Sequence, residues 1–433
     1  MFARALLIGS LAFTALTSVG CEKVDHENID KWGHTEKGPA KLRKALGDDG
    51  IDPDLSAHAA ANLIKHGDDP DVYATLEAMA ASRRAEVVAK LTPRLWDIAR
   101  VENERDLPGP APVAAKDALV RIRKWADDAT RQRIDGYLID WYCVASYEGR
   151  AQRGANLGAT VMRLVGPAAG KKLFAVVNGV IVAPGQDKVK NRIGDELLLG
   201  LAATASPDAV AYVLDIARMD RGDATLATRA MSALFKAYVD PNGLFPVADT
   251  QALVPNLPAI VAIAKDDAMD GQAANDAVSL IRALGAPQCL APLVGMVAAP
   301  HRNSRFKYVA ANNALKCGGT KAIAEIVRAL PDQGVYAKDQ VNGAISGEIA
   351  KMSPRDQALA AARTLLGDKS TVAKWVGMET LAAMKSTEDA AALARLSSSR
   401  DRLVGYWGEH AEGKEDPTLG QRAKELVVEL GVK

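Results

Sequence analysis

The chain has 433 residues, of which 48% are hydrophobic, 25% are charged and only 5% are aromatic, with a formal net charge of +1. This composition excludes a disordered chain, the length exceeds that of most single compact domains, and the balanced charge argues against a nucleic-acid partner. Few aromatic residues beside many Ala, Leu and Val favour helices over a β-sandwich.

The first 21 residues, MFARALLIGSLAFTALTSVGC, contain an apolar run from Ala5 to Leu16 and small residues before Cys21. The run is too short for a membrane span and polar sequence follows it, so it predicts an export signal over 1–20. The segment resembles a bacterial lipoprotein signal, and the resemblance implies that Cys21 is acylated, with palmitate among the acyl groups. Ser18 stands where that family usually has Leu, and a plain secretory signal is the alternative.

The anchor predicted by this resemblance would be the protein's contact with a membrane. Two or three acyl chains hold a protein stably on a bilayer, whereas one does not. Glu22, rather than Asp, follows the Cys, which in such lipoproteins is typical of sorting to the outer membrane. We therefore expect an exported protein that is anchored in the bacterial cell envelope, facing the periplasm. Loss of residues 1–20 removes Arg4 and leaves 53 basic and 53 acidic side chains.

Four segments follow the signal. Residues 21–38 are polar and predict an irregular tether, and residues 39–107 predict N-terminal helical repeats. The prolines of the run ENERDLPGPAP prevent a helix from continuing across it. The run is either a long loop between repeats or a boundary between an N-terminal cap and the main array. Residues 113–190 predict a less regular helical segment, which begins with two helices and contains a buried apolar helix over Leu173–Pro184, with a strand as the alternative.

The remaining residues, 191–433, predict a regular array with a C-terminal capping helix. Ser206, Thr387 and Asp416 each precede a helical pattern, and short polar residues of this kind cap helix N-termini.

An apolar residue closes the second helix of each predicted pair at a nearly regular interval. The intervals between these anchors are 33, 50, 31, 37 and 32 residues, enough for two short helices with their turns. Small residues precede several anchors on the same helical face and allow a neighbouring helix to approach closely. The period predicts an all-α fold, an α-solenoid of stacked antiparallel helix pairs. The anchors are Leu201, Leu234, Leu284, Leu315, Met352 and Met384.

Three segments resemble HEAT repeats. GDDPDVYATLEAM at 67–79 is similar to the start of a first helix, and DATLATRAMSALFK at 223–236 to a second helix, with Arg229 where a basic residue is common. STVAKWVGMETLAAMKSTEDAAALARL at 370–396 supplies the turn between helices. The resemblance implies a HEAT- or armadillo-like superhelix whose concave face binds a protein partner, without enzymatic activity. A HEAT-like lyase, a purely structural envelope component and another helical-repeat family are the alternatives.

No motif predicts a catalytic, cofactor or metal site. GPAAGKK at 166–172 lacks the spacing and the Ser or Thr of a phosphate loop, and GAISG at 343–347 lacks a glycine of the nucleophile elbow. None of the six histidines lies in a zinc-binding pattern, and we interpret them as solvated or capping residues. We expect no cofactor.

Export places the other three cysteines in an oxidising compartment. In the solenoid interpretation, Cys289 begins one helix and Cys317 follows the end of the next, antiparallel helix. The two thiols would then be neighbours, which predicts a disulfide, with two free thiols as the alternative. Cys143 is interpreted as a small buried hydrophobic residue.

The segment HRNSRFKY at 301–308 places basic groups beside aromatic ones at a predicted helix start, and Trp407 lies in the loop sequence VGYWGEH. Aromatic anchors are typical of partner-binding surfaces. Trp32 is likewise expected to be exposed, and a solvated helix start is the alternative for 301–308. The predicted partner-binding residues are Arg302, Arg305, Phe306, Lys307, Tyr308 and Trp407.

Overall fold

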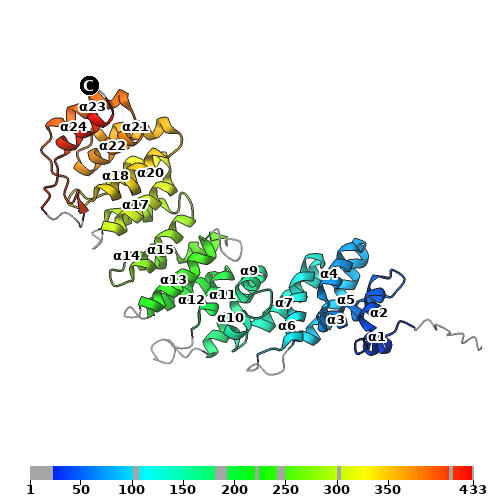
Figure 1. Cartoon of the computed structure of the whole chain (residues 1–433). Helices are drawn as coiled ribbons and strands as arrows, with labels where there is room; N and C mark the ends of the chain where they lie inside the picture. Colours follow the sequence, from blue (N-terminus) through cyan, green and yellow to red (C-terminus); the bar gives the residue numbers. More distant parts are fainter. Residues whose placement is uncertain are drawn as a thin grey trace, which may run out of the picture. The chain divides into compact units, whose positions relative to one another are not determined.

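The computed structural model describes residues 23–100, 107–180, 193–219, 224–240, 249–299, 304–408 and 413–431. Across these ranges the protein is all-α, as predicted. The β-type pairing within them is one isolated antiparallel bridge between Arg402 and Thr418. The chain divides into two compact units, residues 1–101 with 108–134 and residues 102–107 with 135–433 (Figure 1). None of the described helices is long and apolar enough to cross a membrane.

Helix α3 is the centre of the first unit, because α1, α2, α4, α5 and α6 all pack against it. Its sequence PDLSAHAAANLIK contains four alanines and buries all of them, and small side chains allow close helix packing on several sides. Helix α7 (Asp128–Tyr142) crosses the division between the units. The elements are α1 His26–Trp32, α2 Gly38–Gly47, α3 Pro53–Lys65, α4 Asp69–Ala78, α5 Ala81–Ala99, α6 Pro110–Ile122 and the 3₁₀ turn η1 Arg123–Trp125.

The prediction of an irregular tether over 21–38 is wrong from residue 25 onward. The Asp25 side chain caps α1 by accepting a hydrogen bond of 2.9 Å from the backbone N–H of Asn28. Ile29 and Trp32, three residues apart on one helical face, are both buried, so Trp32 is not exposed as expected. The Lys41 ammonium lies 5.4 Å from the Trp32 ring centre. This short helix is anchored to the core by only two apolar residues. Its sequence therefore has too few apolar positions to show a helical pattern.

Residues 108–112 of the proline-rich run belong to the first unit, and residues 102–106 lie outside the described part of the chain. Helix α6 begins at Pro110, where proline fits the first turn, and packs against α3 and α5. The division between the units therefore falls at residue 134 and not at 107–113.

The second unit contains helices α8 to α24. They are α8 Tyr147–Ala151, α9 Gly158–Val165, α10 Pro167–Val180, α11 Asp195–Ala203, α12 Pro207–Met219, α13 Ala224–Tyr238, η3 Thr250–Asn256, α14 Leu257–Lys265, α15 Gly271–Ala283, α16 Leu290–Ala298, α17 Ser304–Gly318, η4 Thr320–Ala322, α18 Ile323–Arg328, α19 Lys338–Gln340, the π-helix η5 Val341–Ser346, α20 Gly347–Ala350, α21 Arg355–Leu366, α22 Thr371–Ala383, η6 Thr387–Asp389, α23 Ala390–Arg395, η7 Leu396–Ser398 and α24 Leu419–Glu429. The apolar segment from residue 173 is helical to 180, as preferred over a strand, and its remainder lies outside the described residues.

A continuous row of helices runs through this unit, in which α11, α13, α15, α17, η5, α22 and α24 each pack against the next (Figure 1). Outside the row, α12, α14, α16 and α21 each pack most extensively against one row helix, in order α13, α15, α17 and α22, and α12 and α16 also contact the preceding row helix. Five of the six predicted anchors identify this row, because they lie in its helices or at their C-caps, and the sixth follows α20, which continues directly from η5. Leu201 lies in α11, Leu234 in α13 and Leu315 in α17, Leu284 and Met384 are the C-caps of α15 and α22, and Met352 follows α20.

Of the three predicted helix starts, only Ser206 directly precedes its α-helix. Thr387 is itself the first residue of the 3₁₀ turn η6, and α23 begins at residue 390. Helix α24 begins at residue 419, because Thr418 and Gln421 form a reciprocal capping box. Asp416 instead accepts a 2.8 Å hydrogen bond from the backbone N–H of Gly405 and holds the preceding loop.

Candidate partner-binding face

The described residues of the segment 301–308 do not form the predicted binding surface. Phe306, Lys307 and Tyr308 lie in the first turns of α17 and are buried. Arg302 lies outside the described residues, as does the side chain of Arg305. The prediction was wrong because the chain over 331–340 returns across this end of α17, where the Tyr308 hydroxyl accepts a hydrogen bond of 3.1 Å from a backbone N–H.

Trp407 is exposed as predicted, with 42% of its surface accessible. Its indole Nε1 donates a hydrogen bond of 3.0 Å to the carbonyl of Glu415. The Lys414 ammonium lies 4.8 Å from the ring centre, and the Tyr406 ring packs edge-on at 4.9 Å. Local contacts thus hold this indole in the loop before α24, and none of them joins it to the described side chains of 306–308.

Three hollows instead lie along the row of helices. The first, between α13 and α15, has a volume of about 510 Å³. The second, of about 310 Å³, lies between α17 and the start of η5, and the third, of about 650 Å³, is lined by η5, α22 and α24. We call the surface that contains these three hollows the row face.

Side-chain amides and hydroxyls make up most of the lining of the first two hollows, whereas charged side chains outnumber them in the third. An amide both donates and accepts hydrogen bonds, and a hydroxyl does the same. Asn312 and Asn313 each use one amide N–H on a backbone carbonyl, that of Ala344 at 3.0 Å and that of Val309 at 2.8 Å. Other lining residues of this kind are Ser232, Asn275, Ser279, Gln340, Asn342 and Ser346.

The π-helix η5 contributes Ala344 to the second hollow and Asn342 to the third. Its side-chain oxygen is buried and has no hydrogen-bond partner within the described part of the chain. π-Helical turns are rare and are frequent at functional sites. Gly347 is required here, because a Cβ at that position would collide with the Asn342 carbonyl oxygen. An unpaired buried acceptor is costly and marks a position where a ligand N–H could bind.

The first hollow contains a buried carboxyl group. Asp276 on α15 is only 5% exposed and accepts a hydrogen bond of 2.8 Å from the Gln272 side chain. Burial raises the pKa of Asp276 to about 6, the Gln272 hydrogen bond opposes this, and the charge of Asp270 adds to it. The group therefore titrates near neutral pH, unlike an ordinary aspartate.

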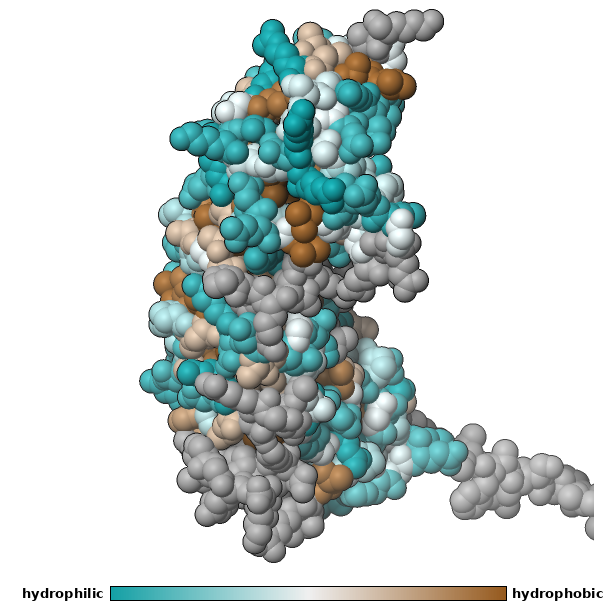
Figure 2. All heavy atoms as spheres, turned by 90° about the vertical axis from the view of Figure 1, so that its left-hand side faces the viewer, coloured by the Kyte–Doolittle hydropathy of each residue, from teal (hydrophilic) through white to brown (hydrophobic). Residues whose placement is uncertain are grey.

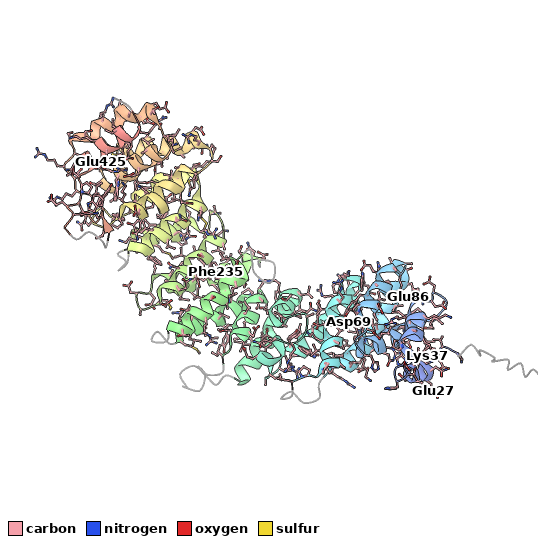
Figure 3. All side chains as sticks on the ribbon, viewed as in Figure 1. Glu27, Lys37, Asp69, Glu86, Phe235 and Glu425 are labelled. Atoms are coloured by element: carbon pink, nitrogen blue, oxygen red, sulfur yellow. A yellow bond between two sulfur atoms is a disulfide. The ribbon has the colours of Figure 1, made fainter. Side chains whose placement is uncertain are left out.

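A buried ion pair forms one wall of the third hollow. Arg422 of α24 and Glu379 of α22 are each 3% exposed, and two hydrogen bonds of 2.7 and 3.1 Å join them. The same guanidinium donates to Glu425, labelled in Figure 3, and to Glu429, each at 2.8 Å. Burial alone would lower the pKa of Arg422, but these carboxylates outweigh it and raise it. Because carboxylates already occupy its donors, Arg422 joins α24 to α22 rather than offering an anion site.

The structure joins Cys289 and Cys317 in a disulfide with a Cα–Cα distance of 6.3 Å. Cys289 is the N-cap of α16 and Cys317 lies in the last turn of α17, the arrangement that the helix pairing predicted. Cys143 is buried, and its burial raises the pKa of this thiol to about 12.

One pair of histidines differs from the solvated or capping role that we expected. His58 of α3 is mostly buried, and its Nδ1 lies 2.8 Å from Nδ1 of His26 on α1. The outer nitrogens face carboxylates, His58 Nε2 at 2.8 Å from Asp30 and His26 Nε2 at 3.3 Å from Asp54. Burial lowers the pKa of His58, with Asp30 opposing it. This pair ties α1 to α3, and the described residues contain no group of three or more metal-binding side chains.

We compared the sequence with protein-family models and with curated proteins. No protein-family model matches the sequence, and no curated protein matches it either. The chemistry of the row face is therefore the basis for a function.

Proposed function

We propose that the protein is a HEAT- or armadillo-like α-solenoid, a non-enzymatic scaffold that binds an extended segment of a partner protein along the row face. The helix pairing supports the solenoid, since α13, α15, α17 and α22 each pack both on the next row helix and on a helix outside the row. Each repeat of such an array buries its apolar stripe only against its neighbours.

The observation that carries the binding proposal is the run of three hollows, lined mostly by amides and hydroxyls in the first two and by charged groups with Asn342, Ser346 and Thr387 in the third. An extended polypeptide presents an N–H and a C=O at every residue, and each needs a partner when it is buried. Large exposed hydrophobic residues of the described chain are few, and on the face drawn in Figure 2 apolar side chains form small separate patches. Recognition through hydrogen bonds therefore suits this protein better than docking on an apolar patch.

Photo-cross-linking tests the proposed binding face. A benzophenone amino acid at Ser232, Asn312 or Asn342 should yield the same partner adduct from all three positions in cells. Matched control positions are Asp215 on α12 and Glu325 on α18, which are exposed outside the row and should yield none. Equal adducts from both sets, or no adduct at all three positions, would refute the proposal.

The proposed cellular setting is the outer membrane, with the protein facing the periplasm and anchored through acylated Cys21. The support is the signal-like N-terminal sequence together with the start of α1. Only three residues separate Cys21 from the N-cap Asp25, so a lipid on Cys21 would hold the first unit within about 14 Å of its attachment point.

Metabolic labelling with palmitate tests this anchor. Wild-type protein should carry the label and sediment with membranes, and Cys21→Ala should lose the label and most of the membrane fraction, because the proposed acyl chains are what anchors it. The buried-thiol variant Cys143→Ala should keep both and serves as the control. Label that persists in Cys21→Ala would rule out acylation at this residue.

A further inference from the structure

The hollow between α13 and α15 contains a carboxyl group that lacks a counter-ion. Asp276 is 5% exposed, and its one hydrogen-bond donor within the described chain is the Gln272 amide at 2.8 Å. None of the described Lys, Arg or His side chains forms an ion pair with it. A buried carboxylate is expensive unless a cation pairs with it, so the site favours a cation supplied by a ligand.

The other groups around Asp276 also favour a cation. Asp270, at the N-cap of α15, accepts hydrogen bonds of 2.9 Å from the Thr228 hydroxyl and the Gln272 backbone N–H. Although burial raises the pKa of Asp270, these bonds lower it overall, so this group is ionised at neutral pH. Asp240 and Lys236, both on the α13 side, are the other charged groups of the lining. The carboxyl groups therefore outnumber the amine.

The lining also has features that suit an organic cation. The Phe235 ring, labelled on α13 in Figure 3, lies in the same lining as Asp276, and the faces of aromatic rings attract ammonium and guanidinium groups. Ser232, Asn275 and Ser279 supply oxygen atoms that accept hydrogen bonds from such a group. A volume of about 510 Å³ accommodates a Lys or Arg side chain.

We propose that this hollow binds an alkylammonium or guanidinium group, with the Asp276 carboxylate as its counter-ion and Phe235 against its apolar stem. We assign this cation to a Lys or Arg side chain of the partner segment, and that assignment rests on the proposed function. A free diamine or guanidine has the same chemistry and is distinguished from the side chain by the experiment.

Binding of the cation should depend on pH. The pKa of Asp276 is raised to about 6, so the carboxyl group is mostly ionised at pH 7.5 and mostly protonated at pH 5.0. A cation binds the ionised form, and affinity should therefore be about tenfold lower at pH 5.0 than at pH 7.5.

Calorimetric titration of the detergent-solubilised full chain with agmatine, which carries both cationic groups, tests the site. We expect saturable binding at pH 7.5, at least about tenfold weaker in Asp276→Asn and unchanged in Asp215→Asn, an exposed control on α12. Ser279→Lys places a competing ammonium one turn from Asp276 and should abolish binding, which keeps the test decisive if Asp276→Asn fails to fold. Absence of binding to the wild type would overturn the proposal. So would binding as tight as that of the wild type by both Ser279→Lys and a folded Asp276→Asn variant.

Competition with the cross-linking at Ser232 separates the two sources. If agmatine suppresses the adduct, the partner's own cation occupies the hollow. If agmatine binds through Asp276 and leaves the adduct unchanged, the cation site stands and the partner's side chain is excluded as its occupant. Adducts along the row face without any agmatine binding would overturn this inference and leave the proposed scaffold function in place.

Discussion

Arg422→Met should lower the free energy of unfolding of the second unit by about 3–5 kcal/mol. The guanidinium is 3% exposed and pairs through two hydrogen bonds with Glu379, which is equally buried. Its removal leaves the Glu379 carboxylate in the interior with a single donor, the Trp375 indole at 3.1 Å. A buried charge that has lost its partner is among the most destabilising results of a single substitution.

Urea unfolding followed by circular dichroism measures this loss, and two variants make it specific. The double variant Arg422→Met with Glu379→Leu removes both charges and should recover most of the lost stability. Arg402→Met is the matched control, because its ion pair with Glu415 is exposed, and it should cost at most about 1 kcal/mol. A loss in Arg422→Met no larger than in this control would show that the buried pair does not hold α24 on α22.

The double variant Cys289→Ala with Cys317→Ala should lose about 3 kcal/mol of unfolding free energy under oxidising conditions. The cross-link closes a loop over a sequence separation of 28, and such a link reduces the conformational entropy of the unfolded chain. Reducing agent should lower wild-type stability by a similar amount and leave the double variant unchanged.

Peptide mapping identifies the linkage itself. The peptides that contain Cys289 and Cys317 should elute as one species without reductant and as two with it, in both the wild type and the Cys143→Ala control. Two separate peptides with free thiols before reduction would show that the cysteines remain reduced, and the stability prediction would then fail as well.

The proposed binding site was harder to predict from the sequence than the helices were. Asp276 is one of 53 acidic residues, and its helix has the same small and apolar pattern as its neighbours. Its burial depends on α13, whose hollow-lining residues lie about forty positions earlier in the chain. Asn342 likewise follows an irregular segment, and only the packing of η5 between α17 and α22 leaves its side-chain oxygen unpaired. A search for polar residues that recur on the faces of the anchor helices would have found part of this set.

The exposed surface was predicted less well, for a related reason. A helical pattern indicates which residues share a face, but not whether a distant segment covers that face. The aromatic and basic residues at 306–308 are therefore buried, and so is Trp32. Trp407, in a loop rich in glycine and polar residues, stayed exposed as its local sequence predicted.

The sequence by itself determined the all-α fold, the spacing of the row helices and the proximity of Cys289 to Cys317, because helix periodicity and small-residue spacing are local properties. Only the tertiary structure established the docking of α1, the burial of Asp276 and the ion pair of Arg422 with Glu379, which lies 43 residues away in the chain. Those features depend on solvent exclusion by segments distant in sequence, and no local pattern encodes which segment excludes the solvent.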